Sequence, residues 1–346
     1  MDIASAQGLW DAQPGYLNTA SYGLPPRPAV ERLESVLDDW RTGRTSWEAW
    51  GVSAEQSRAS FARMLGVEVE DVAIGTTVSQ FVAMVAASLP EGSEIVVPDI
   101  EFTSATYPFL VLERRGIKVR AVPLDELADS LTPSTAAVSF SVVQSANGAV
   151  ADLDRVEAAA RANDVLTVVD STQASGWFPF DGGRFDIVVC HTYKWLMSPR
   201  GSALMYVAPQ LRDKLIPVDA GWYAAEDVHG SYYGTEMELA RSARRFDVSP
   251  AWFSWVGTEP VLALIEGIGV ENIWAHDVAL ANRFRDGLGL EPGDSAIVAV
   301  DVPDAAARLE RAGIRAAARA GFLRAAFHIY NTNDDVDLAL NALTDP

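Results

Sequence analysis

The chain has 346 residues, of which 49% are hydrophobic and 21% charged, as in a folded globular protein that buries a large core. Its 27 basic and 47 acidic residues give a net charge of −20, which argues against nucleic acid or an anionic membrane as a partner. The single cysteine excludes a disulfide framework and a cysteine-based metal cage. No signal-peptide pattern or membrane-length apolar run is present, so we expect a cytoplasmic protein.

The N-terminal part of the chain predicts a turn-rich segment followed by two helices. Residues 1–26 are polar and aromatic, with little regular period. An apolar face of helical period then indicates a helix over 29–41. A second helix is predicted over 54–65, ending at Gly66, a residue that suits a helix C-terminus.

From residue 72 onward, short apolar runs alternate with segments of helical period. Helices are expected over 78–88, 104–115 and 152–162. Seven strands are expected, over 72–74, 94–97, 119–122, 136–143, 166–169, 187–190 and 203–207. This alternation predicts an α/β fold, in which a mostly parallel seven-stranded sheet is covered by helices on both faces.

The composition changes after the seventh strand. Residues 217–256 are rich in Trp, Tyr and Gly without a regular period, and we interpret them as an irregular crossing segment. A long helix is predicted over 259–288, interrupted near Gly267 and Gly269.

The C-terminal tail predicts a small α+β unit. Strands are expected over 296–302, 314–319 and 322–329, and helices over 305–311 and 334–343. We therefore expect two parts: residues 1–256 with the large sheet, and residues 257–346 with the long helix and a small domain.

Polar side chains follow two neighbouring strands of the predicted sheet. Asp170 closes one apolar run and Gln173 comes soon after it, while Lys194 follows the next run. Taken singly, a capping Asp and a surface Lys would be ordinary. Because the carboxyl ends of parallel strands meet at one edge, where ligands bind, the three together favour a site. A lysine among aromatic residues must also be bonded or neutral to offset its desolvation.

Further candidates follow other strand ends. Thr76 and Thr77 begin a helix, where backbone amides and hydroxyls favour an anion such as phosphate, although Thr is also an ordinary helix cap. His191 offers another donor, and Ser145 lies beyond a further strand. Phe102 suits either a stack on a flat ring or a place in the core.

Arg324 lies in the apolar run Phe322-Leu-Arg-Ala-Ala-Phe, which predicts that its guanidinium is partly buried. A buried arginine needs a carboxylate partner, and the residues alone leave two sources for it: a substrate or an internal acid.

A phosphate cup, an aromatic ring, an Asp–Gln pair and a lysine amine together describe a pyridoxal 5'-phosphate (PLP) site. The chain resembles the class V aminotransferase family of fold type I PLP enzymes, which includes isopenicillin N epimerase-like proteins, cysteine desulfurases and kynureninase. The motifs that carry the resemblance are Asp170-Ser-Thr-Gln173 and Tyr193-Lys194-Trp-Leu-Met-Ser-Pro-Arg-Gly201, and it extends from Tyr16 to the Asn331-Thr-Asn-Asp-Asp-Val segment.

The resemblance implies a Schiff base at Lys194 and a pairing of Asp170 with the pyridinium nitrogen. It also implies an amino acid substrate and a homodimer with shared active sites. The remaining implied contacts are those of Gln173 with the phenolic oxygen (Ser145 near it), Phe102 with the ring, Thr76, Thr77 and His191 with the phosphate, Gly257 and Thr258 of the partner subunit with the phosphate, Arg324 with the substrate α-carboxylate, and Asn18 with the substrate.

Departures from the family pattern bear on the reaction. The only cysteine, Cys190, lies in an apolar strand rather than on a C-terminal loop, which argues against persulfide-forming desulfurase chemistry. Transamination is the first expectation, a C–S or other β-elimination lyase the second, and epimerisation the third. A cofactor-binding regulatory protein is the non-enzymatic alternative, and the intact set of Asp170, Gln173, Lys194 and Arg324 speaks against it.

Overall fold

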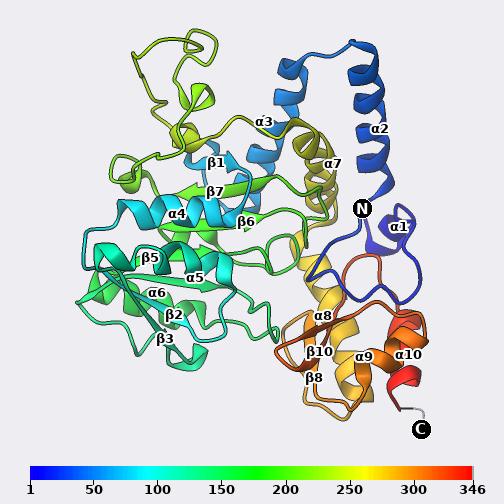
Figure 1. Ribbon diagram of the computed structural model, residues 1–346. Helices are drawn as coiled ribbons and strands as arrows, with labels where there is room; N and C mark the ends of the chain where they lie inside the picture. The colour runs from blue at the N-terminus through cyan, green and yellow to red at the C-terminus, as the bar shows by residue number, and fades with distance from the viewer. Residues whose placement is uncertain (345–346) are drawn as a thin grey trace.

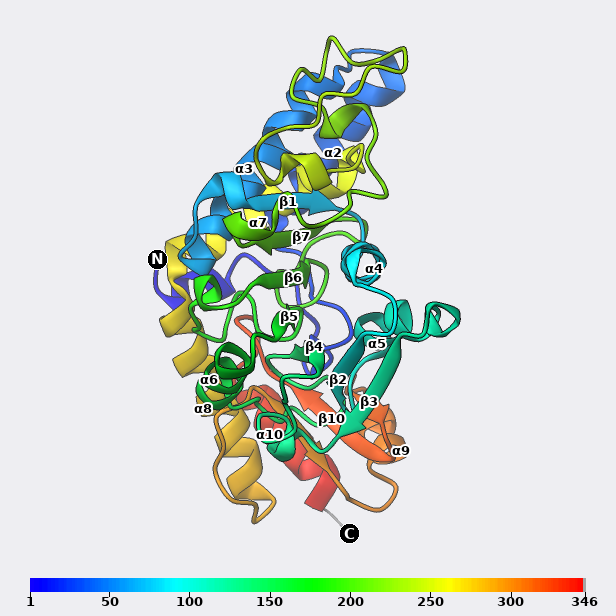
Figure 2. The ribbon, with the colours of Figure 1, turned by 90° about the vertical axis from the view of Figure 1, so that its left-hand side faces the viewer.

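A seven-stranded sheet runs through the larger part of the molecule, in a computed structural model that describes residues 1–344. Its order is β1-β7-β6-β5-β4-β2-β3, which Figure 2 shows from top to bottom. Only β7 runs antiparallel to its neighbours, and the other pairs are parallel. The strands are β1 (Val72–Gly75), β2 (Glu94–Pro98), β3 (Lys118–Val122), β4 (Thr135–Ser141), β5 (Leu166–Asp170), β6 (Ile187–His191) and β7 (Ala203–Val207). The predicted α/β fold with a mostly parallel sheet is confirmed.

The central strands are apolar throughout because both faces of the sheet are covered. Along β5, Val168 belongs to the core on one face and Val169 to the core on the other, as the alternation of side chains along a strand requires. Helices α4 (Val78–Ser88) and α5 (Thr103–Leu110) contribute to the core that contains Val168, and α6 (Leu153–Asn163) contributes to the core that contains Val169.

Three further helices flank the sheet: α2 (Arg27–Thr42), α3 (Trp47–Leu65) and α7 (Trp252–Ile268), and α7 packs against both α2 and α3 (Figure 1). A short α1 (Ile3–Gln7) precedes them. The predicted starts of α3, at residue 54, and of α7, at residue 259, are both wrong by seven residues. The ring centroids of Trp47 and Trp252 lie 5.4 Å apart, so contacts between the two helices stabilise these first turns. The apolar period of either segment alone does not reveal such contacts.

The long C-terminal helix is broken at Gly269, as predicted. This glycine has φ of 91° and separates α7 from α8 (Val270–Gly287), whereas Gly267 lies inside α7. Within residues 1–344 no single helix is long and apolar enough to cross a membrane, and α7 and α8 meet such a test only as a pair bent by 84°.

The C-terminal part forms a second, three-stranded antiparallel sheet of order β8-β10-β9. Its elements are β8 (Ile297–Val300), α9 (Ala305–Arg311), β9 (Ala317–Arg319), β10 (Phe322–Ala326) and α10 (Asn333–Thr344), with strands shorter than predicted. The N-terminal segment joins this unit: Asn18 forms a bridge to Ala326, and Leu17 is fully buried in the same core (Figure 1). The division at residue 257 stays a prediction.

Residues 217–251 contain only short 3₁₀ turns, in agreement with the irregular segment predicted there. Their return to the core is held by a buried ion pair, in which Arg58 Nη2 donates to Asp247 Oδ2 at 2.6 Å. Asp247 Oδ1 also accepts the Ile74 amide, so one carboxylate joins α3, β1 and the irregular segment.

Replacing Asp247 with asparagine should lower the free energy of unfolding by about 3 kcal/mol, because it leaves the charge of buried Arg58 without its buried anion. Urea denaturation measures the change. Asp337→Asn is the matched control, since its ion pair with Arg283 is nearly half exposed and its loss should cost less than about 1 kcal/mol. Equal effects of the two substitutions would contradict a stabilising role for the buried pair.

Candidate active site

The carboxyl ends of the central strands bring the predicted site residues to one edge of the sheet. Gly75 at the end of β1 and His191 at the end of β6 both pair with Ala203 of β7, and Asp170 at the end of β5 pairs with Val189. The loop between β6 and β7, which carries Lys194, therefore leaves the sheet beside Asp170 and beside the helix start at residues 76–78.

Lys194 is buried at 5% exposure, and its amine donates no hydrogen bond to any other residue of the described chain. Its Nζ lies 5.1 Å from the centre of the Phe102 ring. Burial lowers the pKa of this amine to about 8, with Arg324 acting in the same direction and Asp170 against it. A substantial fraction is thus neutral near physiological pH, as a nucleophilic or proton-accepting amine requires.

The N-terminal segment contacts the loop that carries Lys194 and holds it in place. The Gly23 amide donates to the Tyr193 carbonyl at 2.9 Å. A Cβ atom on Gly23 would lie only 1.9 Å from the Lys194 carbonyl oxygen, so no other residue fits there without moving the loop. The Met197 amide donates back to the same carbonyl at 3.0 Å, and the loop then turns through the left-handed φ of 44° at Met197.

Two carboxyl groups lie at this edge. Asp170 is 6% exposed and accepts the Thr172 amide at 2.8 Å; burial raises its pKa, while the Thr172 contacts and Lys194 lower it. Glu101, which the sequence interpretation missed, accepts the amides of Phe102 and Ser141. Burial also raises the pKa of Glu101, and Asp170 adds to that shift. Glu101 thereby fixes the loop that carries Phe102 against the end of β4.

Gln173, Ser145 and Arg324 form one connected group. The Gln173 amide donates to the Ala20 carbonyl at 3.1 Å and to the Ser145 hydroxyl at 2.9 Å. Arg324 donates to the same hydroxyl at 3.1 Å and to Ser21 Oγ at 2.7 Å. Both amide hydrogens of Gln173 are therefore in use, so the contact expected between Gln173 and a cofactor oxygen would have to replace one of these bonds.

Arg324 is 2% exposed and has no carboxylate partner within residues 1–344. Its Nε is buried without a hydrogen bond, and burial lowers the pKa of the guanidinium to about 10. Of the two sources of a partner that the sequence left open, the described chain does not supply the internal acid. A buried guanidinium without an anion is poised for the carboxylate of a ligand.

The start of α4 and the end of β6 hold the residues expected to bind phosphate. Thr77 caps α4 by accepting the Gln80 amide, and the Thr76 amide and hydroxyl both donate to the Gln80 side chain. His191 has a buried Nε2 without a partner, and burial, with Arg200 and Lys194, lowers its pKa to about 3. The imidazole is therefore neutral and can donate one hydrogen bond.

The placement of Gly257 and Thr258 does not fit the role expected for them. Both lie inside α7, and Thr258 is fully buried, with its hydroxyl donating to the Ser254 carbonyl and bonded to Ser202 Oγ. A side chain enclosed in its own subunit cannot reach the phosphate of another, so this contact was wrongly predicted. The homodimer itself stays a prediction.

Asn18 lies beside β10, the strand that carries Arg324, and its Oδ1 is buried without a partner. His191 Nε2 and Arg324 Nε are likewise buried without partners, so three such atoms lie on segments that meet at this edge of the described structure. Buried polar groups without partners are costly, so their gathering fits a polar, anionic ligand such as PLP with an amino acid.

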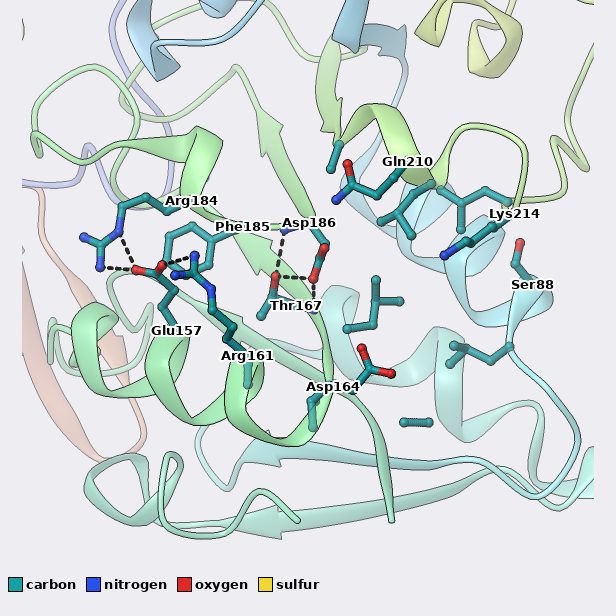
Figure 3. A pocket seen from close by; sticks show the side chains of 18 of the residues that line it. Ser88, Glu157, Arg161, Asp164, Thr167, Arg184, Phe185, Asp186, Gln210 and Lys214 are labelled. Carbon is teal, nitrogen blue, oxygen red and sulfur yellow. Dashed lines mark hydrogen bonds and ion pairs between the residues drawn. The ribbon is translucent and has the colours of Figure 1, made fainter. Parts of the chain in front are cut away.

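A separate cavity of about 820 Å³ lies elsewhere. It opens at the amino ends of β5 and β6, where Thr167 and Asp186 line it (Figure 3), and thus at the edge of the sheet opposite Lys194. Its charged side chains are largely bonded to one another: Glu157 pairs with Arg161 and Arg184, and Asp186 accepts from Thr167 (Figure 3). The chemistry is therefore assigned to the carboxyl edge.

The chain is similar to known proteins. A family model described as aminotransferase class-V matches residues 41–309. The uncharacterized aminotransferase YcbU of Bacillus subtilis is 25% identical, with 94% of this chain and 93% of that protein covered. Isopenicillin N epimerase of Streptomyces clavuligerus is 28% identical, over 80% of this chain and 75% of that protein.

Solved structures share the fold. Cysteine desulfurase CsdA of Escherichia coli superposes with a TM-score of 0.84 at 21% identity, covering 99% of this chain and 97% of the other. A variant of C-DES with glycine covalently linked to its PLP cofactor superposes with a TM-score of 0.88 at 22% identity, covering 100% and 99%.

The environment of Lys194 predicts how cofactor capture depends on pH. Capture of added PLP by the cofactor-free protein should accelerate as the pH rises through about 8, because only the neutral amine reacts and burial lowers its pKa to that value. Stopped-flow absorbance measures the rate. Asp170→Asn should move the midpoint lower, since it removes an anion that raises this pKa. A midpoint near 10.5, the value of an ordinary lysine, would contradict the assignment.

Proposed function

The chain belongs to the aminotransferase class-V family of PLP-dependent enzymes, and we propose that it transfers the amino group of an amino acid by means of Lys194. The observation that carries this proposal is Arg324, a buried guanidinium without a carboxylate partner in the described chain, whose charge acts on the amine of Lys194. An amine and a guanidinium without an anionic partner together suit a ligand that has both an amino group and a carboxylate.

The residues at the sheet edge fit the cofactor. Thr76, Thr77 and His191 would hold its phosphate at the N-terminus of α4, where the helix dipole favours an anion. Asp170 would supply a buried carboxylate for the ring nitrogen, and Phe102 a flat apolar face. When bound, PLP supplies an electron sink for a substrate from which an α proton has been removed.

The chain's own contribution is the movement of that proton. Lys194 is neutral often enough near its pKa of about 8 to accept a proton from the α carbon and to return it. Phe102, whose ring centre lies 5.1 Å from this amine, cannot carry a proton. This favours a reaction in which one base serves throughout, such as amino transfer, over an epimerisation that uses a second base.

Cys190 does not support persulfide-forming desulfurase chemistry. Its thiol is 1% exposed inside β6, and burial raises its pKa to about 12. A thiol that stays protonated in a strand core is a poor nucleophile. The family's other reactions at the α carbon, including β-elimination, use the same lysine and arginine and remain as outcomes for the test.

The wild-type protein should show a visible absorbance band with PLP that is absent in Lys194→Ala. Under single turnover with an amino acid, the band should convert to the pyridoxamine form, with one keto acid formed and no ammonia. Release of ammonia together with the keto acid would instead assign a β-elimination lyase. A wild-type protein that gains no band with added PLP would refute the proposal altogether.

Arg324→Gln should lower kcat/KM for the amino acid by about 100-fold, because loss of a buried, bidentate charge partner typically costs 2–5 kcal/mol. The absorbance of bound PLP should not change, since the arginine is assigned to the substrate alone. Arg324→Lys is the matched control: it keeps the charge but not the fork, and should recover only part of the loss. Loss of bound cofactor in Arg324→Gln would contradict this role.

A further inference from the structure

A buried histidine joins the small domain to the loop of Lys194. His328 follows β10, and its Nδ1 lies 2.7 Å from Oδ2 of Asp277 on α8. Its Nε2 lies 2.9 Å from the carbonyl oxygen of Trp195, the residue directly after Lys194. Both His328 and Asp277 are fully buried. Three segments distant in sequence thus meet at one imidazole.

The two contacts determine where the protons are. A carbonyl oxygen only accepts, so Nε2 of His328 carries a hydrogen and donates it to Trp195. The second proton lies between Nδ1 and Asp277, on the imidazole or on the carboxyl group, because two lone pairs would repel at this distance. In either arrangement the pair is neutral as a unit, and its donor toward the lysine loop is retained.

Trp195 is also held through its side chain. Its indole Nε1 donates to Gln173 Oε1 at 2.7 Å, and Trp177 Nε1 donates to the Gln173 carbonyl at 2.7 Å. The Trp195 ring packs edge-on against the His328 ring, with centroids 5.0 Å apart. The backbone and the side chain next to Lys194 are therefore fixed by two separate donor–acceptor contacts.

A buried ionisable pair is a poor choice for stability alone. Replacing such a pair with apolar residues of similar volume is often neutral or stabilising, because both groups must be desolvated. The bond to His328 offsets only part of this cost for Asp277, since its Oδ1 is buried without a partner and burial raises its pKa. The directional bond to the Trp195 carbonyl is what an apolar replacement would not supply.

We propose that His328, oriented by Asp277, is a positioning residue that holds Lys194 in place through the Trp195 carbonyl. The small domain thereby contributes twice to the site. His328 fixes the backbone next to Lys194, and Arg324 binds the substrate. This inference rests on the proposed function of Lys194, and His328 itself touches neither substrate nor cofactor.

Three variants of the full-length protein test the inference. His328→Leu removes the donor. Asp277→Asn keeps it, because an asparagine amide can donate to Nδ1 and leave the hydrogen on Nε2. Phe327→Leu is the matched control for lost packing, since Phe327 is next to His328 in the chain and fully buried in the small-domain core, a cluster that includes no residue of the lysine loop.

The readouts separate position from stability. After borohydride reduction at limiting PLP, peptide mass analysis gives the fraction of Lys194 that carries the cofactor. Visible circular dichroism reports how rigidly the bound cofactor is held, and thermal unfolding reports stability. His328→Leu should lose Lys194 labelling and most of the dichroism, with kcat lowered about 10- to 100-fold and KM little changed. Asp277→Asn should resemble the wild type, and Phe327→Leu should lower only the unfolding temperature.

If His328→Leu does not fold, Asp277→Leu replaces it, because the unanchored imidazole should turn away and give the same losses in a milder form. A donor-lacking variant that matches Phe327→Leu in every readout would overturn the inference and leave Lys194 in its proposed role. A wild-type protein without PLP on Lys194 would instead overturn the proposed function.

Discussion

Removal of the Lys194 amine from water is the constraint on which the site depends. A charged ammonium at 5% exposure is strongly disfavoured, so the surroundings must either stabilise it or let it lose its proton. Asp170 does the first, while Arg324 and the apolar neighbours do the second, and the pKa of about 8 is the balance. Because neither influence prevails, both the charged and the neutral amine are present near neutral pH.

Holding that balance requires a rigid loop, and three parts of the chain provide it. The sheet supplies both ends of the loop, the N-terminal segment contacts the Tyr193 and Lys194 carbonyls through Gly23, and the small domain contacts the Trp195 carbonyl through His328. Gln173 links these parts, since it bonds Ala20, Ser145 and Trp195 together. The polar groups of the site are thus bonded mainly to each other, and the few left without partners lie on segments that meet at the same edge of the sheet.

Features carried by local pattern could be predicted from the sequence, and features carried by distant contacts could not. The seven strands, α4 and the meeting of Asp170 with Lys194 follow from apolar runs and from the geometry of parallel sheets. The first turns of α3 and α7 depend on aromatic rings that meet between the two helices, so the hydrophobic period of each segment does not reveal them. Thr258 was misassigned for the same reason, because the early start of α7 encloses it. Glu101, Gly23 and His328 act through backbone groups of other segments, which leave no local signature.

The placement of the N-terminal segment has a consequence for biosynthesis. Residues 16–18 pair with residues 315 and 326, nearly the whole chain apart, and Gly23 then closes on the Lys194 loop. The N-terminal segment is therefore synthesised long before β10 and cannot take its place in the fold until β10 has been made. The large sheet can form before β10 is made, whereas the loop of Lys194 gains all its contacts only afterwards. The family match begins at residue 41, so the part that waits lies outside the region shared with the family model.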